Sequence, residues 1–155
     1  MYEDKDDDEG RLDAAEQLAD YNPRAAIEAF TAIACDQEVG DEVRLSAAEQ
    51  LAELDPSAAG PACLAIARDR EVGDEVRLSA AEALAEADPR AAGPACLAIA
   101  TDGEVGDEVR LSAAELLAEV DPSAAGPACL AIARDRSVGD GVRHSAAEQL
   151  AALSA

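Results

Sequence analysis

Apolar residues recur along this chain with the spacing of amphipathic α-helices. In residues 42–54, valine, leucine and alanine side chains fill one wide arc of a helical wheel, and glutamate, serine and glutamine fill the narrow remainder. An apolar arc wider than half the circumference is typical of a helix that contacts its own partner and the neighbours on both sides. The pattern therefore predicts an all-α fold of closely stacked helices.

Two kinds of helix start alternate along the chain. Asp55-Pro56 places a capping carboxylate before a proline at the first helical position, where the missing N–H costs nothing. The proline at Pro61 then predicts either a kink or a short turn before a helix that begins there. A Val-Gly-Asp turn precedes the second helix, and we expect Gly73 to be left-handed and Asp74 to cap that helix. The first type of start recurs at Asn22-Pro23, Asp88-Pro89 and Asp121-Pro122.

The paired helices belong to a block of 33 residues that recurs four times. The second and third copies have the same residue at 28 of 33 positions. Such a period is typical of a solenoid, in which each unit is too small to bury its own apolar face and stacks on the next. The pattern predicts about nine helices. The copies span residues 22–54, 55–87, 88–120 and 121–153, and a half repeat spans 11–21.

The chain is strongly acidic, with a net charge of −22. This charge repels nucleic-acid phosphates and anionic lipids, so we expect binding to neither nucleic acid nor membranes. No apolar run approaches the roughly 20 residues that cross a bilayer, and no secretory signal is recognisable, so a cytoplasmic location is expected. Residues 1–10 are almost wholly charged and are expected to form a disordered acidic tail, which leaves 11–155 as a single domain.

The four cysteines are predicted to be structural. Cys63, Cys96 and Cys129 occupy one position of successive repeats, whereas Cys35 falls elsewhere in its repeat. Stacked helices lie about 8–10 Å apart, beyond the reach of a disulfide, so we expect small buried thiols in a reducing cytoplasm. Four spread thiols and one histidine do not have the spacing of a zinc site, and no metal or cofactor is expected.

The string D-x-x-V-G-D-E-V-R-L-S-A-A-E-x-L-A, which includes the loop residue Asp69 and the pair Val76-Arg77, resembles a HEAT-type repeat. The likeness is to the short HEAT-like kind with two helices per unit, and it covers residues 11–155. It implies a right-handed α-solenoid that acts as a protein-binding scaffold, with the second helices lining its concave face. The Val-Gly-Asp loop is longer than the usual turn of such repeats. This departure counts against the Asp–Arg pairing that the resemblance implies.

An arginine interrupts the apolar arc in the first turn of each second helix. Arg44 is expected beside the preceding loop, where its guanidinium can meet the carboxylates of Asp36 or Asp41 or open backbone carbonyls. We interpret these arginines as a structural ladder that ties repeat to repeat; the alternative is direct contact with a ligand. The ladder comprises Arg44, Arg77, Arg110 and Arg143, and Arg11 matches it.

The polar stripes of the second helices carry the candidate binding site. Stacking aligns equivalent glutamates into two rows, with Ala83 and Leu116 as an apolar floor between them. This arrangement suits a peptide or helix in which arginine or lysine flanks an apolar residue. The alternative is a solvated acidic face without a ligand. The rows are Glu49, Glu82, Glu115 and Glu148, and Glu53, Glu86 and Glu119.

No catalytic constellation is recognisable. His144 and Ser145 are sequence neighbours that point about 100° apart on a helix, and the Val-Gly-Asp turns lack the lysine and spacing of a phosphate loop. We therefore expect a non-enzymatic scaffold that binds a basic or amphipathic protein segment. One alternative is an assembly module that self-associates through the C-terminal repeat, whose outer face is less polar. Another is an acidic decoy that mimics nucleic acid.

Overall fold

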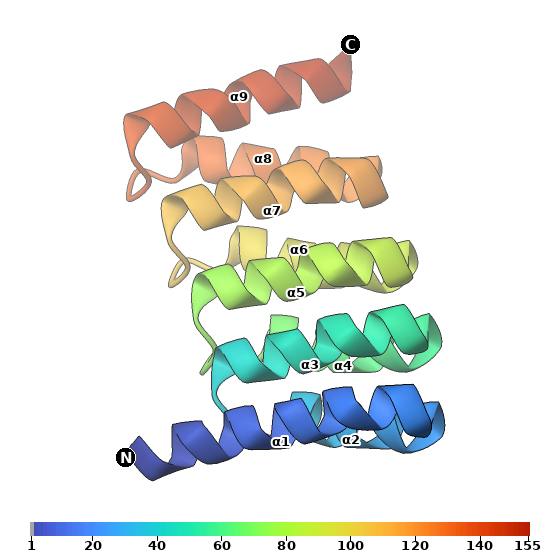
Figure 1. Cartoon of the computed structure of the whole chain (residues 1–155). Helices are drawn as coiled ribbons and strands as arrows, with labels where there is room; N and C mark the ends of the chain where they lie inside the picture. The colour runs from blue at the N-terminus through green and yellow to red at the C-terminus, as the bar shows by residue number, and fades with distance from the viewer. Residues whose placement is uncertain (1) are drawn as a thin grey trace.

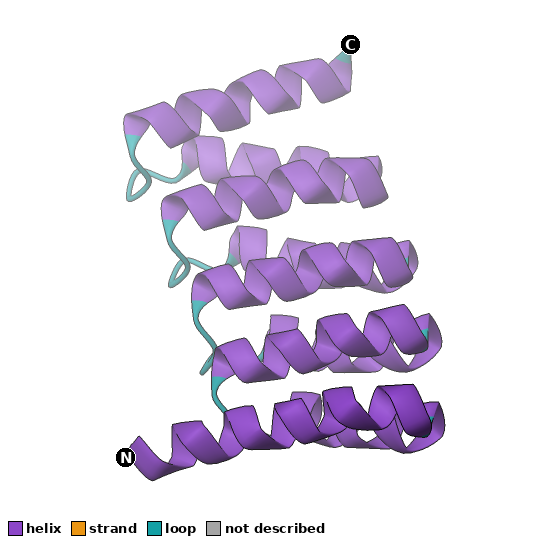
Figure 2. Ribbon diagram, viewed as in Figure 1, coloured by secondary structure: helices purple, strands orange, loops and turns teal. Residues whose placement is uncertain are grey.

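The computed structural model describes residues 2–155, with side chains from residue 6 onward. Within this range the regular structure is entirely helical, and short loops join the helices (Figures 1 and 2). The predicted all-α solenoid of about nine helices is confirmed. The helices are α1 (Tyr2–Tyr21), α2 (Pro23–Cys35), α3 (Asp41–Leu54), α4 (Pro56–Arg68), α5 (Asp74–Ala87), α6 (Pro89–Thr101), α7 (Asp107–Val120), α8 (Pro122–Arg134) and α9 (Asp140–Ser154).

The helices form two layers. The odd-numbered helices α1, α3, α5, α7 and α9 pack side by side in one layer, and α2, α4, α6 and α8 form the other (Figure 1). Each helix also packs on its neighbours in the chain, and no contacts are made between more distant units of the described chain. A solenoid of this kind holds together through local contacts between adjacent units.

The core is a continuous column of small side chains between the layers. Alanines dominate it, and each complete unit adds a few larger groups, such as Leu84 and Ile99, which are 0% exposed. Alanine allows helices to approach closely, because its side chain is a single methyl group. No helix within residues 2–155 is long and apolar enough to span a bilayer.

The first helix of each unit begins as predicted. The Asp55 carboxylate accepts hydrogen bonds from the backbone N–H groups of Ser57 and Ala58, at 3.1 and 3.4 Å, and Pro56 is the first helical residue. The helix then runs unbroken through Pro61. The alternative of a helix that begins at Pro61 is therefore wrong, because the cap at Asp55 already starts the helix and the Pro61 ring lies on its exposed side. Equivalent caps are made by Asn22, Asp88 and Asp121.

The start of the second helix differs from the prediction. Gly73 has φ −57°, and none of the described residues has a positive φ, so the expected left-handed glycine is wrong. Gly73 is itself the N-cap, with an extended ψ of 145°, and Asp74 makes no capping hydrogen bond to its own helix. Asp74 is the first helical residue, where the helix dipole favours its negative charge. Its carboxylate is free to reach the following unit.

The acidic N-terminal segment is also a correction. Residues 2–10 are helical and continue into the rest of α1, so the expected disordered tail over 1–10 is wrong for them; Met1 lies outside the described residues. Asp8 stands 33 residues before Asp41, and its carboxylate accepts a hydrogen bond from the Gly40 N–H at 3.0 Å. The half repeat therefore begins at Asp8. Carboxylates near a helix N-terminus are favourable, which explains how so acidic a segment stays helical.

Candidate functional site

A ladder of buried arginines joins successive units. The Arg44 side chain is 3% exposed; its Nε donates to the Ala34 carbonyl at 3.1 Å and its Nη1 to Asp69 Oδ2 at 3.0 Å. Asp69 belongs to the loop of the following unit. The predicted ladder is present, but the expected carboxylate partners, Asp36 and Asp41 of the same unit, are wrong. Asp36 is engaged by Arg11 at 3.1 Å, and Asp41 faces the next unit.

The same contact repeats along the stack. Arg77 and Arg110 are both 4% exposed, and each has its Nε within 3.1 Å of a carbonyl of the preceding helix. The carboxylate partners lie 25 residues further on, in the next loop. The longer Val-Gly-Asp loop is therefore compatible with Asp–Arg pairing. The pairs are Arg11–Asp36 at 3.1 Å, Arg77–Asp102 at 3.6 Å and Arg110–Asp135 at 3.0 Å.

A second ladder, made of aspartate and glycine, was not predicted. Asp41 Oδ2 accepts a hydrogen bond from the Gly73 N–H of the following unit at 2.9 Å. This contact gives the carboxylate at the start of each second helix a role between units. The recurrence of Val-Gly-Asp every 33 residues was the sequence signal of this ladder. From sequence alone, however, the aspartate is more simply interpreted as a helix cap. The equivalent bonds are Asp8–Gly40, Asp74–Gly106 and Asp107–Gly139.

The loop aspartates of the arginine ladder are held in their charged form. The hydrogen bond from Arg44 lowers the pKa of Asp69 from its ordinary value of 3.8. The Ser137 hydroxyl and the Arg110 guanidinium lower the pKa of Asp135 to about 2. A group whose pKa is lower in the folded state stabilises the fold above the unfolded pKa, and this contribution is lost as pH falls through the folded value.

This linkage predicts a pH-dependent effect of Asp135→Asn. The difference in free energy of unfolding between wild type and the variant should be present at pH 5 and should shrink steadily as pH is lowered from about 4 to about 2. Repulsion among the other carboxylates is common to both proteins and cancels in the difference. Urea unfolding followed by circular dichroism at several pH values measures it. A difference that stays constant from pH 5 to pH 2 would contradict the assignment of Asp135 as a charged partner.

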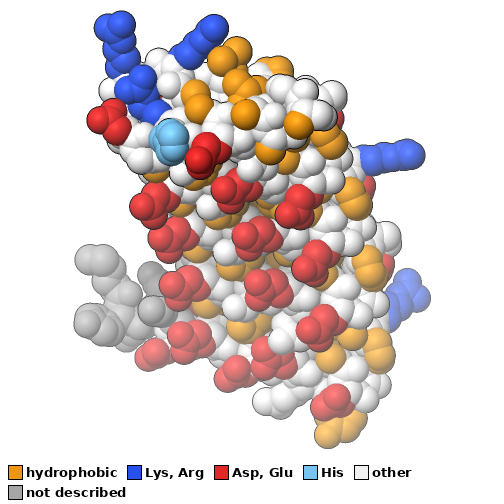
Figure 3. Space-filling model, turned by 90° about the horizontal axis from the view of Figure 1, so that it is seen from above, with side chains coloured by type: hydrophobic (Ala, Val, Ile, Leu, Met, Phe, Trp, Pro, Cys, Tyr) orange, Lys and Arg blue, Asp and Glu red, His pale blue; other side chains and the backbone are white. Residues whose placement is uncertain are grey.

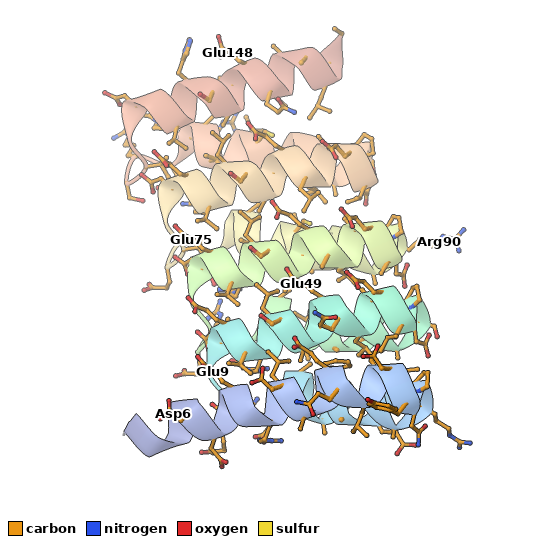
Figure 4. The ribbon with its side chains drawn as sticks, in the orientation of Figure 1. Asp6, Glu9, Glu49, Glu75, Arg90 and Glu148 are labelled. Atoms are coloured by element: carbon orange, nitrogen blue, oxygen red, sulfur yellow. The ribbon has the colours of Figure 1, made fainter. Side chains whose placement is uncertain are left out.

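The predicted glutamate rows lie on the outer side of the odd-numbered layer. Acidic side chains cover this face in rows, with apolar patches between them, and basic side chains lie at its edges (Figure 3). Figure 4 shows Glu49 and Glu148 pointing off the same side of α3 and α9, whereas Arg90 points away at the start of α6. The glutamates of both rows are exposed, namely Glu49, Glu53, Glu82, Glu86, Glu115, Glu119 and Glu148.

Part of this face is a groove between α3 and α5 with a volume of about 630 Å³. Two glutamates from each helix line it, and the predicted floor residue Ala83 lies among other small side chains. We call this feature the acidic groove. It presents four carboxylates around an apolar strip, with no cation among its lining residues. The lining residues are Glu49, Ala52, Glu53, Pro56, Ser79, Glu82, Ala83, Glu86 and Ala87.

The other predicted site residues lie further along the same face and do not line the acidic groove. Leu116 is partly buried on α7 and packs against the core. Glu148 on α9 has its Oε1 3.3 Å from His144 Nε2. Residues 2–21 extend the rows in the other direction, because Glu16 and Asp20 stand 33 residues before Glu49 and Glu53 and are exposed. These two were missed, although the 33-residue register identifies them.

Three of the four cysteines, Cys63, Cys96 and Cys129, are buried and unpaired. Burial, with the negative charge of Glu49 nearby, raises the pKa of Cys63 to about 11, and burial raises the pKa of Cys96 to about 11. Thiols with such values stay protonated near neutral pH and are poor nucleophiles. Cys35 is exposed, so the expectation of burial is wrong for it. It is the last residue of α2, where the equivalent positions hold Arg68, Thr101 and Arg134.

The described residues contain no cluster of three or more histidine, cysteine, aspartate or glutamate side chains arranged to hold a metal ion. The acidic groove itself offers carboxylates and small apolar side chains for contact. No protein-family model matches the chain, and no curated protein or solved structure matches it either.

Proposed function

We propose that the protein is a non-enzymatic scaffold that binds a basic segment of another protein in the acidic groove. The observation that carries this proposal is the groove itself, in which Glu49, Glu53, Glu82 and Glu86 surround a strip of alanine side chains. A segment with arginine or lysine on either side of a small apolar residue matches this surface in charge and in polarity. We place this activity in the cytoplasm, because four unpaired cysteines favour a reducing compartment.

The strength of such binding depends on several contacts acting together. One exposed ion pair contributes about 0.2–1 kcal/mol, so a single arginine would be held weakly. Four carboxylates around one strip allow two cations of the same segment to pair at once. Burial of an apolar side chain on Ala52, Ala83 and Ala87 adds about 25 cal/mol for each Å² removed from water. The ionic part is screened by salt, whereas the apolar part is not.

Charge reversal within the groove is expected to abolish most of this binding. The probe is a labelled synthetic peptide in which two arginines flank a leucine, and fluorescence anisotropy measures its affinity. The double variant Glu82→Lys, Glu86→Lys should bind about tenfold more weakly or worse, because two favourable pairs become repulsive. Raising the salt concentration should weaken binding to the wild type more than binding to the variant.

A matched control separates the groove from the overall acidity of the chain. Glu71→Lys with Glu104→Lys changes the net charge by the same amount in two exposed loops outside the groove. This control should bind the peptide within a factor of about two to three of the wild type, as expected for distant, screened charges. Equal weakening by both double variants would mean that only net charge matters. Unchanged binding by the groove variant would exclude the groove as the site.

A further inference from the structure

On the outer face of α8 and α9, the ladder residues Arg143 and Asp140 are more exposed than their equivalents in the other complete units. The Arg143 side chain is 35% exposed, whereas Arg44, Arg77 and Arg110 are 3–4% exposed. Its Nη1 lies 3.4 Å from Asp140 Oδ1 of its own helix, and the Asp140 side chain is fully exposed. In every earlier unit the equivalent aspartate accepts a hydrogen bond from the next glycine.

The same face exposes side chains that are core residues elsewhere. Ala147 is exposed, although the equivalent Ala48, Ala81 and Ala114 are 0% exposed. Leu150 is only partly buried, whereas Leu84 at the equivalent position is 0% exposed. These residues share one side of α9 with the charged pair, so the face has an apolar centre next to one cation and one anion. We call it the terminal face.

We propose that the terminal face joins two copies of this chain in a two-fold symmetric dimer. In such a contact the Arg143 guanidinium of each copy pairs with the Asp140 carboxylate of the other, and the Ala147 and Leu150 side chains meet at the centre. A two-fold contact requires a self-complementary surface. The terminal face meets this requirement, since it presents one donor and one acceptor of opposite charge beside an apolar patch.

Charge selects this end of the molecule for self-association. Copies that carry a net charge of −22 repel one another over most of their surface. Residues 121–153 are the exception, because three arginines nearly balance four carboxylates there. A contact between two terminal faces also places the acidic α1 helices of the two copies at opposite ends of the dimer. It is the arrangement with the least repulsion.

A head-to-tail contact with α1 fits less well. Residues 2–21 hold nine aspartates and glutamates against two cations, so Asp140 of the terminal face would meet further carboxylates. The position equivalent to Gly40, whose N–H donates a hydrogen bond to the ladder carboxylate, is Asp7 in α1. The two-fold contact avoids this mismatch because Arg143 supplies the partner for Asp140. Such a contact closes at two copies, whereas a head-to-tail contact would continue into fibres.

Sedimentation equilibrium of the 155-residue chain at rising concentration tests the proposal. The terminal face is about two helices wide and roughly 20 Å long, which is small for an interface, so we expect a weak dimer that dissociates on dilution. The variant Arg143→Asp should weaken dimerisation at least tenfold, because like charges then face each other. Adding Asp140→Arg to this variant restores the reciprocal pair with its signs exchanged and should restore dimerisation. Arg90→Glu, on an exposed residue at the start of α6, should leave it unchanged.

Several results would overturn the proposal. These are a monomer at all concentrations, a dimer indifferent to Arg143→Asp, failure of the charge-exchanged variant to dimerise while it remains folded by circular dichroism, or growth into species larger than a dimer. The outcome is independent of the proposed function, because the acidic groove lies between α3 and α5 and peptide affinity is measured separately.

Discussion

Leu84→Ala is expected to lower the free energy of unfolding by about 3 kcal/mol. The Leu84 side chain on α5 is 0% exposed and packs in a core made mostly of alanine. Its removal loses the transfer free energy of the side chain and leaves a cavity, which together cost about 2–5 kcal/mol for a buried leucine. Surrounding alanines have no flexible side chains that could fill the space. Urea unfolding monitored by circular dichroism measures the loss.

Leu150→Ala is the matched control for this substitution. Leu150 occupies the same position of the last unit but is only partly buried. Leu150→Ala should therefore lower the free energy of unfolding by less than half as much as Leu84→Ala, because much of the Leu150 side chain already contacts water. Equal losses at the two positions would show that contact with the following unit contributes little at Leu84. The loss would then come from packing within the unit.

Arg44→Met should also destabilise the chain by about 3 kcal/mol. The substitution removes the donor to the Ala34 carbonyl and leaves the Asp69 carboxylate, whose side chain is 12% exposed, without its cation. Breaking a largely buried pair by removing one partner is costly because the other charge remains desolvated. Arg44 joins one unit to the next, so the loss should fall on the coupling between units. Thermal unfolding followed by circular dichroism should show a broader transition as well as a lower midpoint.

The end of the stack again provides a control. Arg143 is 35% exposed; its Nε donates to the Ala133 carbonyl at 3.1 Å, but the carboxylate paired with it, Asp140, belongs to its own helix and not to another unit. Arg143→Met should therefore change the free energy of unfolding by less than about 1 kcal/mol at concentrations where the chain is monomeric. If Arg143→Met lowered the free energy of unfolding more than Arg44→Met, contacts between units would not determine the cost of removing these arginines.

The helices and the caps of the first helix of each unit were predictable because the determinants are local. The apolar arc of residues 42–54 identifies a helix with neighbours on three sides, and Asp55-Pro56 marks the next helix start within two residues. The reach of Asp74 was not predictable in this way. A carboxylate at a helix start satisfies the pattern of a cap, and only the stacking geometry brings its oxygen to the Gly106 N–H of the next unit.

Composition misled the interpretation of residues 2–10. Their charge favours disorder, but Asp8 and Glu9 stand in register with Asp41 and Glu42, and this agreement indicates a helix that belongs to the repeat. The 33-residue register is a better predictor of structure in this segment than its composition. The reason is that the Gly40 N–H of the neighbouring unit donates a hydrogen bond to the Asp8 carboxylate.

The candidate site was predictable in outline only. The period aligned the glutamates, but the position of the groove depends on the size of its floor. Ala83 and Ala87 line the acidic groove, whereas α7 has the larger Leu116 and Val120 at the equivalent positions. The helices α3, α5 and α7 therefore present equivalent glutamates beside floor residues of different size.

The most direct test of the account is a nuclear magnetic resonance titration of the isotope-labelled chain with the peptide in which two arginines flank a leucine. If equivalent carboxylates of stacked units form one recognition surface, the amide signals that shift should belong to α3 and α5 around Glu49, Glu53, Glu82 and Glu86, and salt should reverse the shifts. Shifts scattered over both layers, or absent from α3 and α5, would contradict it.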